Sequence, residues 1–296
     1  MSCSTYTTFY GTVAYDATDA SLKRFDLSYQ NLKTSPDLSE ITDLRMLDLS
    51  GNPDLDIVQT LQTISAPERL QVLRLDSLNL KQLPDLDRFK NLKQLSLIHN
   101  PDLPWDTVFT TIAPLPLEFL NLKGNALQQL PQSISLLKSI KDLNLSYNHI
   151  VDEATYTYLK QLPLLYNLWL DHNAFGVLPE GVGQLDQVVY FYIDHNELQS
   201  LPDAMLGMKN LTVLHAGHNN FEELPVQFIQ MESLFMVHAN TNKITHIPEL
   251  YFTEKCRLLA LILDNNPLPE AQVKRVKKHF SNFFLLSFEQ KNYGYR

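Results

Sequence analysis

The sequence predicts an α/β solenoid in which every repeat contributes one short parallel strand and an outer return segment. Three observations predict it: eleven copies of one pattern at steps of 22 to 26 residues, alternation of apolar and polar residues within each copy, and helical spacing between some copies. Units of this length cannot bury an apolar face alone, so neighbouring copies must stack into a continuous core. The copies begin at Leu22, Leu44, Leu70, Leu92, Leu117, Ile140, Leu165, Val188, Leu211, Leu234 and Leu258.

The pattern Leu-x-x-Leu-x-Leu-x-x-Asn-x-Leu contains a strand of about five residues. In the seventh copy, Leu168 and Leu170 alternate with the more polar Asn167, Trp169 and Asp171. Alternation with period two places the leucines on one face of a strand and the other residues on the opposite face. One such strand per copy, always in the same direction, gives a parallel sheet.

Asparagine recurs where the chain turns inward after each strand. A short amide can donate to and accept from backbone groups that lose water at this turn. Two copies depart from the column, with Gln30 near the start and Leu78 in the third copy, and the pattern offers no account of Leu78. The column comprises Asn52, Asn100, Asn125, Asn148, Asn173, Asn196, Asn219, Asn242 and Asn266.

The outer segments are of two kinds. Residues 56–64, 106–112 and 152–162 follow an acidic start with apolar residues at helical spacing, so copies two, four and six are expected to carry outer helices. Other copies instead have a Leu-Pro or Ile-Pro pair five residues after the asparagine, as in Leu178-Pro179. Proline fixes φ and removes a donor, which favours an extended or turning segment there.

These motifs resemble those of leucine-rich repeat proteins, over residues 22–268. The Leu-Pro pairs are similar to the short 23-residue class, and the longer copies to the ribonuclease-inhibitor style. The resemblance implies a right-handed, curved horseshoe with a parallel concave sheet and a convex face of short helices and extended segments. It also implies a binding or scaffold role, because the fold presents a broad exposed sheet.

We expect one structural domain with a lid at each end, because an open solenoid would expose its core leucines. Residues 1–21 are expected to form the first lid, and residues 269–296 a helix–strand lid that begins at Pro269. Only Cys3 and Cys256 are present, without the cysteine-rich caps usual in extracellular animal relatives. We therefore expect a bacterial protein or a reducing compartment.

Composition narrows the function. A net charge of −9 disfavours nucleic acid as a partner, and no apolar run reaches the ~18 residues of a membrane span. The first residues lack a basic stretch followed by an apolar run. We expect a cytoplasmic monomer without cofactors, or a secreted or periplasmic one if a leader precedes this sequence. Phosphate-loop, dinucleotide and Gly-x-Ser-x-Gly motifs are missing, so no catalytic residue and no enzymatic activity are predicted.

The residues expected on the open face of the sheet change character near the seventh copy. Earlier copies present mostly polar side chains there, and later copies present aromatic rings, which mark binding surfaces when exposed. Aromatic residues also favour strands for packing reasons alone. The predicted partner-binding residues are Trp169, Tyr190, Tyr192, His215, His238, Met236, Asp171 and Asp194.

Histidines form a second pattern. His172, His195 and His218 precede the asparagine in three successive copies, and aspartate precedes two of them. Imidazole and carboxylate bind zinc, and neighbouring imidazoles can act as a pH switch. The leading hypothesis is a non-enzymatic module that binds a protein through copies seven to ten. The alternatives are a metal-binding or metal-dependent site at these histidines and aspartates, and glycan or peptide recognition at the aromatic residues.

Overall fold

The computed structural model describes residues 22–255 and 257–290, which fall into two compact units, 1–121 and 122–296. The expected first lid at 1–21 and the thiol of Cys256 lie outside the described residues. No helix in the described part is long and apolar enough to cross a lipid bilayer.

Unit 1 contains five parallel strands that pair in chain order, each with the next. They are three residues long rather than the predicted five, although backbone hydrogen bonds between neighbouring repeats continue beyond them, as from Leu49 N–H to the carbonyl of Arg74 at 3.0 Å. The strands are β1 Arg24–Asp26, β2 Met46–Asp48, β3 Val72–Arg74, β4 Gln94–Ser96 and β5 Phe119–Asn121.

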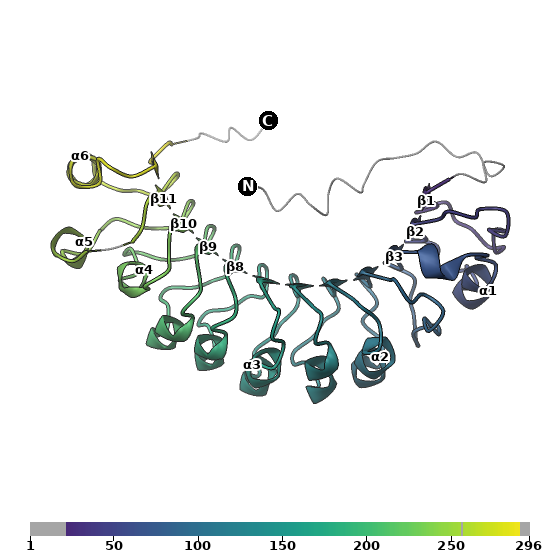
Figure 1. The fold of residues 1–296 in the computed structure, drawn as a ribbon. Helices are drawn as coiled ribbons and strands as arrows, with labels where there is room; N and C mark the ends of the chain where they lie inside the picture. Colours follow the sequence, from purple (N-terminus) through teal and green to yellow (C-terminus); the bar gives the residue numbers. More distant parts are fainter. Residues whose placement is uncertain (1–21, 256, 291–296) are drawn as a thin grey trace. The chain divides into compact units, whose positions relative to one another are not determined.

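Unit 2 contains seven strands, and the pairs from β6 to β12 are parallel and sequential. Its helices and 3-10 segments lie along one side of the strands (Figure 1), and none of the helices within residues 22–255 and 257–290 covers the other side of the sheet. The strands are β6 Asp142–Asn144, β7 Asn167–Trp169, β8 Tyr190–Tyr192, β9 Val213–His215, β10 Met236–His238, β11 Ala260–Ile262 and β12 Leu285–Ser287.

The three predicted outer helices are confirmed as α1 Ile57–Gln62, α2 Trp105–Ile112 and α3 Glu153–Leu159. Two begin at an aspartate whose carboxylate accepts a backbone N–H of the first turn: Asp56 from Gln59 at 2.9 Å and Asp152 from Thr155 at 3.1 Å. Such caps satisfy an N–H that the helix leaves unpaired.

The Leu-Pro pairs initiate a turn of 3-10 helix. Pro131, Pro179 and Pro202 lie directly before η3 Gln132–Leu136, η4 Glu180–Gln184 and η5 Asp203–Gly207. A fixed φ suits the entry to a helical turn, and the missing N–H is not needed there. The remaining outer elements are η2 Pro67–Arg69, α4 Gln227–Gln230, α5 Leu250–Thr253 and α6 Glu270–His279.

The asparagine column forms the predicted buried ladder. Nδ2 of Asn196 donates to carbonyl oxygens of Leu170 and Ile193 at 3.1 and 3.0 Å, and its Oδ1 accepts the N–H of Asn173 at 2.8 Å. The residue before each ladder position has a φ between +51 and +70°. A left-handed residue thus directly precedes every asparagine of the ladder, and this conformation sets the direction of its side chain.

Candidate functional site

Four aromatic side chains stack across the open sheet face of unit 2. We call Trp169, Tyr192, His215 and His238 the ring stack. Successive ring centroids are 5.0, 4.5 and 4.1 Å apart, with interplanar angles of 11°, 21° and 15°. The stack crosses β7 to β10, with one ring per strand.

Strand register produces this arrangement. Trp169 pairs with Tyr192, Tyr192 with His215, and His215 with His238 in the parallel ladder. Parallel strands lie ~4.8 Å apart, which is close to the separation of stacked rings. Planar side chains at like positions can therefore lie face to face without moving the backbone.

The ring stack is less exposed than the alternation predicts. Trp169, His215 and His238 are half-buried, but Tyr192 is only 9% exposed. Both faces of the Tyr192 ring are covered by its neighbours in the stack. The expectation that all four side chains face water is therefore wrong for Tyr192.

Two further predicted residues flank the ring stack. Tyr190 is tilted by 48° against Tyr166, with centroids 5.4 Å apart. The sulfur of Met236 lies 3.3 Å from Nε2 of His238. Both contacts widen the apolar surface beside the rings, so the stack belongs to a broader patch.

A second column of rings follows the turns at the ends of the strands. We call Tyr147, His172, His195 and His218 the turn stack. Its centroids are 4.0, 4.3 and 3.9 Å apart, and its planes are within 14° of parallel. All four residues have φ between +51 and +56°, and this shared conformation aligns their side chains. Asn and His tolerate this region better than most residues do.

The predicted carboxylates lie between the two stacks in the repeat. Asp171 accepts a hydrogen bond from the Ser146 hydroxyl at 2.5 Å, and its second oxygen is 3.1 Å from Nδ1 of His172. Asp194 accepts the N–H of Gly217 at 2.9 Å. Burial, with a smaller effect from the charge of Asp171, raises the pKa of Asp194 to about 6.

Burial disfavours the charged form of four imidazoles in the two stacks. Burial, with a smaller effect from the neighbouring His238, lowers the pKa of His215 to about 4. Burial alone lowers the pKa of His238. Burial also lowers the pKa values of His195 and His218, with a smaller effect from other imidazoles of the turn stack. These four lowered pKa values disfavour a positive charge on His195, His215, His218 and His238 near pH 7.

The stacked geometry suits metal binding poorly. A tetrahedral metal needs lone pairs that converge on one point, and lone pairs of an imidazole lie in the ring plane. In His172, His195 and His218 the planes are nearly parallel and 3.9 to 4.3 Å apart, so these lone pairs run side by side. Within 22–255 and 257–290, no three His, Cys, Asp or Glu side chains form a group that could hold a metal ion.

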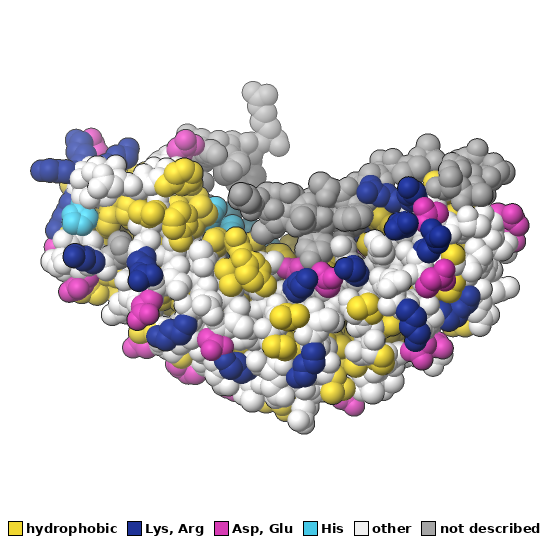
Figure 2. All heavy atoms as spheres, in the orientation of Figure 1, with side chains coloured by type: hydrophobic (Ala, Val, Ile, Leu, Met, Phe, Trp, Pro, Cys, Tyr) yellow, Lys and Arg dark blue, Asp and Glu magenta, His cyan; other side chains and the backbone are white. Residues whose placement is uncertain are grey.

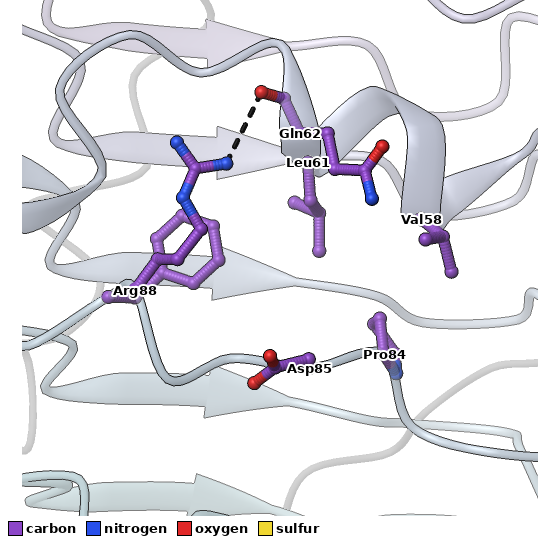
Figure 3. A pocket seen from close by; sticks show the side chains of 7 residues that line it. Val58, Leu61, Gln62, Pro84, Asp85 and Arg88 are labelled. Carbon is purple, nitrogen blue, oxygen red and sulfur yellow. Dashed lines mark hydrogen bonds between the residues drawn. The ribbon is translucent and has the colours of Figure 1, made fainter.

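Unit 1 presents a different surface. On its sheet, Arg74 forms ion pairs with Asp48 at 3.0 Å and with Asp76 at 3.3 Å. Beside α1, Arg88 donates to the carbonyl of Gln62 at 3.2 Å at the edge of a small pocket (Figure 3). The pocket volume of about 90 Å³ is well below the ~300 Å³ of a typical ligand pocket.

Three residues that contact the two stacks and their neighbours in unit 2 were not predicted from the sequence. Tyr147 extends the turn stack, Lys123 lies 4.2 Å from the centroid of the Tyr147 ring, and Tyr166 contacts Tyr190. Tyr147 directly precedes Asn148, as the three histidines precede their asparagines, so the alignment of copies contained the signal for it.

Comparison with known proteins supports the repeat assignment. The family model described as "Leucine rich repeat" matches residues 163–221. A leucine-rich repeat protein of Leptospira interrogans is 24% identical, with 94% of this chain and 85% of that chain covered and a TM-score of 0.58. An internalin of Listeria monocytogenes is 18% identical, with 91% and 81% covered and a TM-score of 0.62.

Drosophila Toll, solved in complex with Spatzle, is 21% identical, with 83% of this chain but 36% of that chain covered and a TM-score of 0.63. No curated protein matches the sequence. Identities this low support the fold and carry no function by themselves. The repeated pattern, the asparagine ladder and these matches make the chain a leucine-rich repeat protein.

Proposed function

We propose that this chain is a non-enzymatic interaction module that binds a protein partner on the open sheet face of unit 2, centred on the ring stack. The observation that carries the proposal is the in-register stacking of four rings on one sheet face, three of them half-buried. Trp and Tyr dominate the energetics of protein interfaces because they contribute large, rigid contact areas.

Rigidity supports the same proposal. Each ring is held by neighbours on adjacent strands, so little side-chain freedom remains to be lost on binding, and a preformed surface lowers that entropic cost. The Toll–Spatzle complex shows a protein of this fold with a protein partner. The net charge of −9 favours a protein over a nucleic acid here.

The test replaces Trp169 and Tyr192 together with alanine and compares partner capture from the lysate of the source organism. Loss of two interface aromatics is expected to weaken binding by about 2 kcal/mol or more, roughly thirtyfold in Kd. The matched control replaces Tyr29 and Phe284, which are 69% and 79% exposed and lie outside the ring stack. Each variant is checked for folding by circular dichroism.

The proposal fails if the Trp169→Ala/Tyr192→Ala protein is folded and retains every partner that the wild type captures. It also fails if the Tyr29→Ala/Phe284→Ala control loses binding to the same extent. The second outcome would show that any loss of exposed aromatic surface reduces capture, whatever its position.

A further inference from the structure

The open face of unit 2 has an uneven distribution of charge. Four columns of like positions cross it: the first and third strand positions, the residue two after the strand, and the left-handed turn. From the sixth copy to the last strand these columns hold 28 residues, with five Asp or Glu and no Lys or Arg. The acidic residues are Asp142, which is buried, and Asp171, Asp194, Asp264 and Glu289, which are at least partly exposed.

This distribution differs from that elsewhere in the chain, which has 24 Lys and Arg residues in total. Figure 2 shows basic and acidic side chains interspersed over the side of the molecule in view. The nearest basic residue along the turn columns is Lys123, which lies against the Tyr147 ring. A surface with carboxylates and without cations complements a positively charged partner.

Asp171 and Asp194 lie between a residue of the ring stack and a residue of the turn stack in their repeats. They follow Trp169 and Tyr192 by two residues and directly precede two rings of the turn stack. Asp194 is half-buried and accepts the N–H of Gly217 at 2.9 Å. A half-buried carboxylate without a nearby cation is poorly stabilised, so an added ammonium or guanidinium group would lower the energy of its charged form.

The rings suit the remainder of a basic side chain. The aliphatic stems of Arg and Lys pack on apolar surface while their charged ends reach a polar group. Guanidinium groups also stack on aromatic rings, and cation–π contact with Trp or Tyr adds further attraction. Rings and carboxylates in adjacent columns therefore match the two ends of one long basic side chain.

We propose that the partner docks on this face with a basic segment whose Arg or Lys side chains lie over the ring stack and pair with Asp171 and Asp194. The inference rests on the proposed function and specifies the chemistry of its partner. Long-range attraction follows as well, because a net charge of −9 steers a basic segment toward the protein at low ionic strength.

The experiment selects random dodecapeptides displayed on phage against the immobilised full-length chain, with counter-selection on the Trp169→Ala/Tyr192→Ala protein. Peptides that need the rings are synthesised, and their Kd values are measured by calorimetry. We expect them to be enriched in Arg and Lys, with affinity that falls as salt is raised from 50 to 500 mM, roughly from a 14 to a 4 Å screening length.

The decisive variant is Asp171→Asn/Asp194→Asn. Asparagine keeps an oxygen that can accept the hydrogen bonds from Ser146 and Gly217, so the fold is retained while two charges are removed. We expect Kd to rise by about tenfold or more, as for close charge pairs at interfaces. The matched control Glu222→Gln/Glu232→Gln removes the same charge from exposed positions outside the four columns and is expected to change Kd less than threefold.

Two other outcomes are informative. Ring-dependent peptides that lack basic residues, or that bind equally well to Asp171→Asn/Asp194→Asn, would overturn the basic partner and leave the proposed function standing. A selection that yields no ring-dependent peptide, with the wild type folded, would overturn both.

Discussion

Replacing Asn148 with alanine is expected to destabilise unit 2 by about 4 kcal/mol. The side chain is fully buried, and its Oδ1 accepts the backbone N–H groups of Asn125 at 2.9 Å and Leu127 at 3.0 Å. Alanine removes this shared acceptor. A buried donor without its acceptor costs about 1–3 kcal/mol, so two cost about 2–6 kcal/mol.

The donor side of the same amide adds less. Nδ2 of Asn148 donates to three carbonyl oxygens at 3.0 to 3.2 Å. One of them, the oxygen of Leu145, also accepts Nδ2 of Asn173 at 3.0 Å, so it keeps a partner in the variant. Carbonyl oxygens have two lone pairs and tolerate the loss of one bond better than an N–H tolerates losing its only acceptor.

Equilibrium urea unfolding measures the effect. The chain has two tryptophans, Trp105 in α2 and Trp169 in β7, one in each unit. A Trp105→Phe background leaves Trp169 as the fluorescence reporter of unit 2, and midpoint and slope are fitted separately. The control Asn220→Ala removes an amide next to a ladder position and is expected to change stability by less than about 1 kcal/mol.

The reasoning is refuted if Asn148→Ala lowers the free energy of unfolding by less than about 1 kcal/mol at an unchanged slope. An equal decrease in the free energy of unfolding in Asn148→Ala and Asn220→Ala would refute it too, because a ladder amide would then stabilise the fold no more than an amide outside the ladder. A reduced slope would instead indicate that the variant unfolds in parts, which long repeat proteins can do.

Three further substitutions probe other features of unit 2. The pKa of His215 is about 4 in the folded state and about 6.5 in the unfolded state, so between these pH values the unfolded state binds more protons. The contribution of His215 to the free energy of unfolding therefore falls as pH drops from 6.5 to 4. His215→Phe should reduce this acid sensitivity in urea unfolding, and NMR titration of His215 gives its pKa. The pKa of Asp194 is raised to about 6, so its ionisation destabilises the folded state above that pH, and its effect on stability changes with pH in the direction opposite to that of His215. Asp194→Asn should therefore stabilise the protein at pH 7.5 by on the order of 1 kcal/mol, and urea unfolding should show this gain vanish toward pH 4. Gly183→Ala would place Cβ 2.1 Å from the backbone oxygen of Ala204 and should lower the free energy of unfolding by about 2 kcal/mol or more, whereas Gly176→Ala, with no atom within 4 Å of the added Cβ, should change it by less than about 1 kcal/mol.

Much of the fold could be predicted because the sequence repeats its constraints. Each copy places leucines and an asparagine at fixed offsets, so an error in register would misplace the whole set at once. The outer helices were equally visible, since Asp56 and Asp152 are caps that also stand out in the sequence. The division at residues 121 and 122 had no such signal, because the step from Leu117 to Ile140 is an ordinary 23 residues.

The candidate site was predicted as a list of residues but not as two stacks. Register puts Trp169 and Tyr192 side by side, but parallel ring planes depend on side-chain rotamers that no pattern encodes. The burial of Tyr192 follows from that stacking and was missed for the same reason.

The asparagine ladder continues past Leu78 on one side. The N–H groups of Leu78 and Leu80 are both accepted by Asn100 Oδ1 at 3.2 Å, so the ladder continues on that side.

The turn stack combines backbone strain with ring contact, and the two can be separated by mutation. A non-glycine residue in the left-handed region costs roughly 1–2 kcal/mol, and each stacked aromatic pair returns about 0.5–1.5 kcal/mol. His195 at φ +51° stacks on His172 and His218, so its two contacts offset its strain. Thr241 at φ +54° occupies the same place in the tenth copy with a side chain that cannot stack. His195→Gly should therefore change the free energy of unfolding of unit 2 by less than about 1 kcal/mol, whereas Thr241→Gly, which only relieves strain, should raise it by about 1 kcal/mol, both measured by urea unfolding with Trp169 fluorescence. Stabilisation by both substitutions would show that imidazole stacking contributes little, and the histidines would then owe their place to binding rather than to the fold.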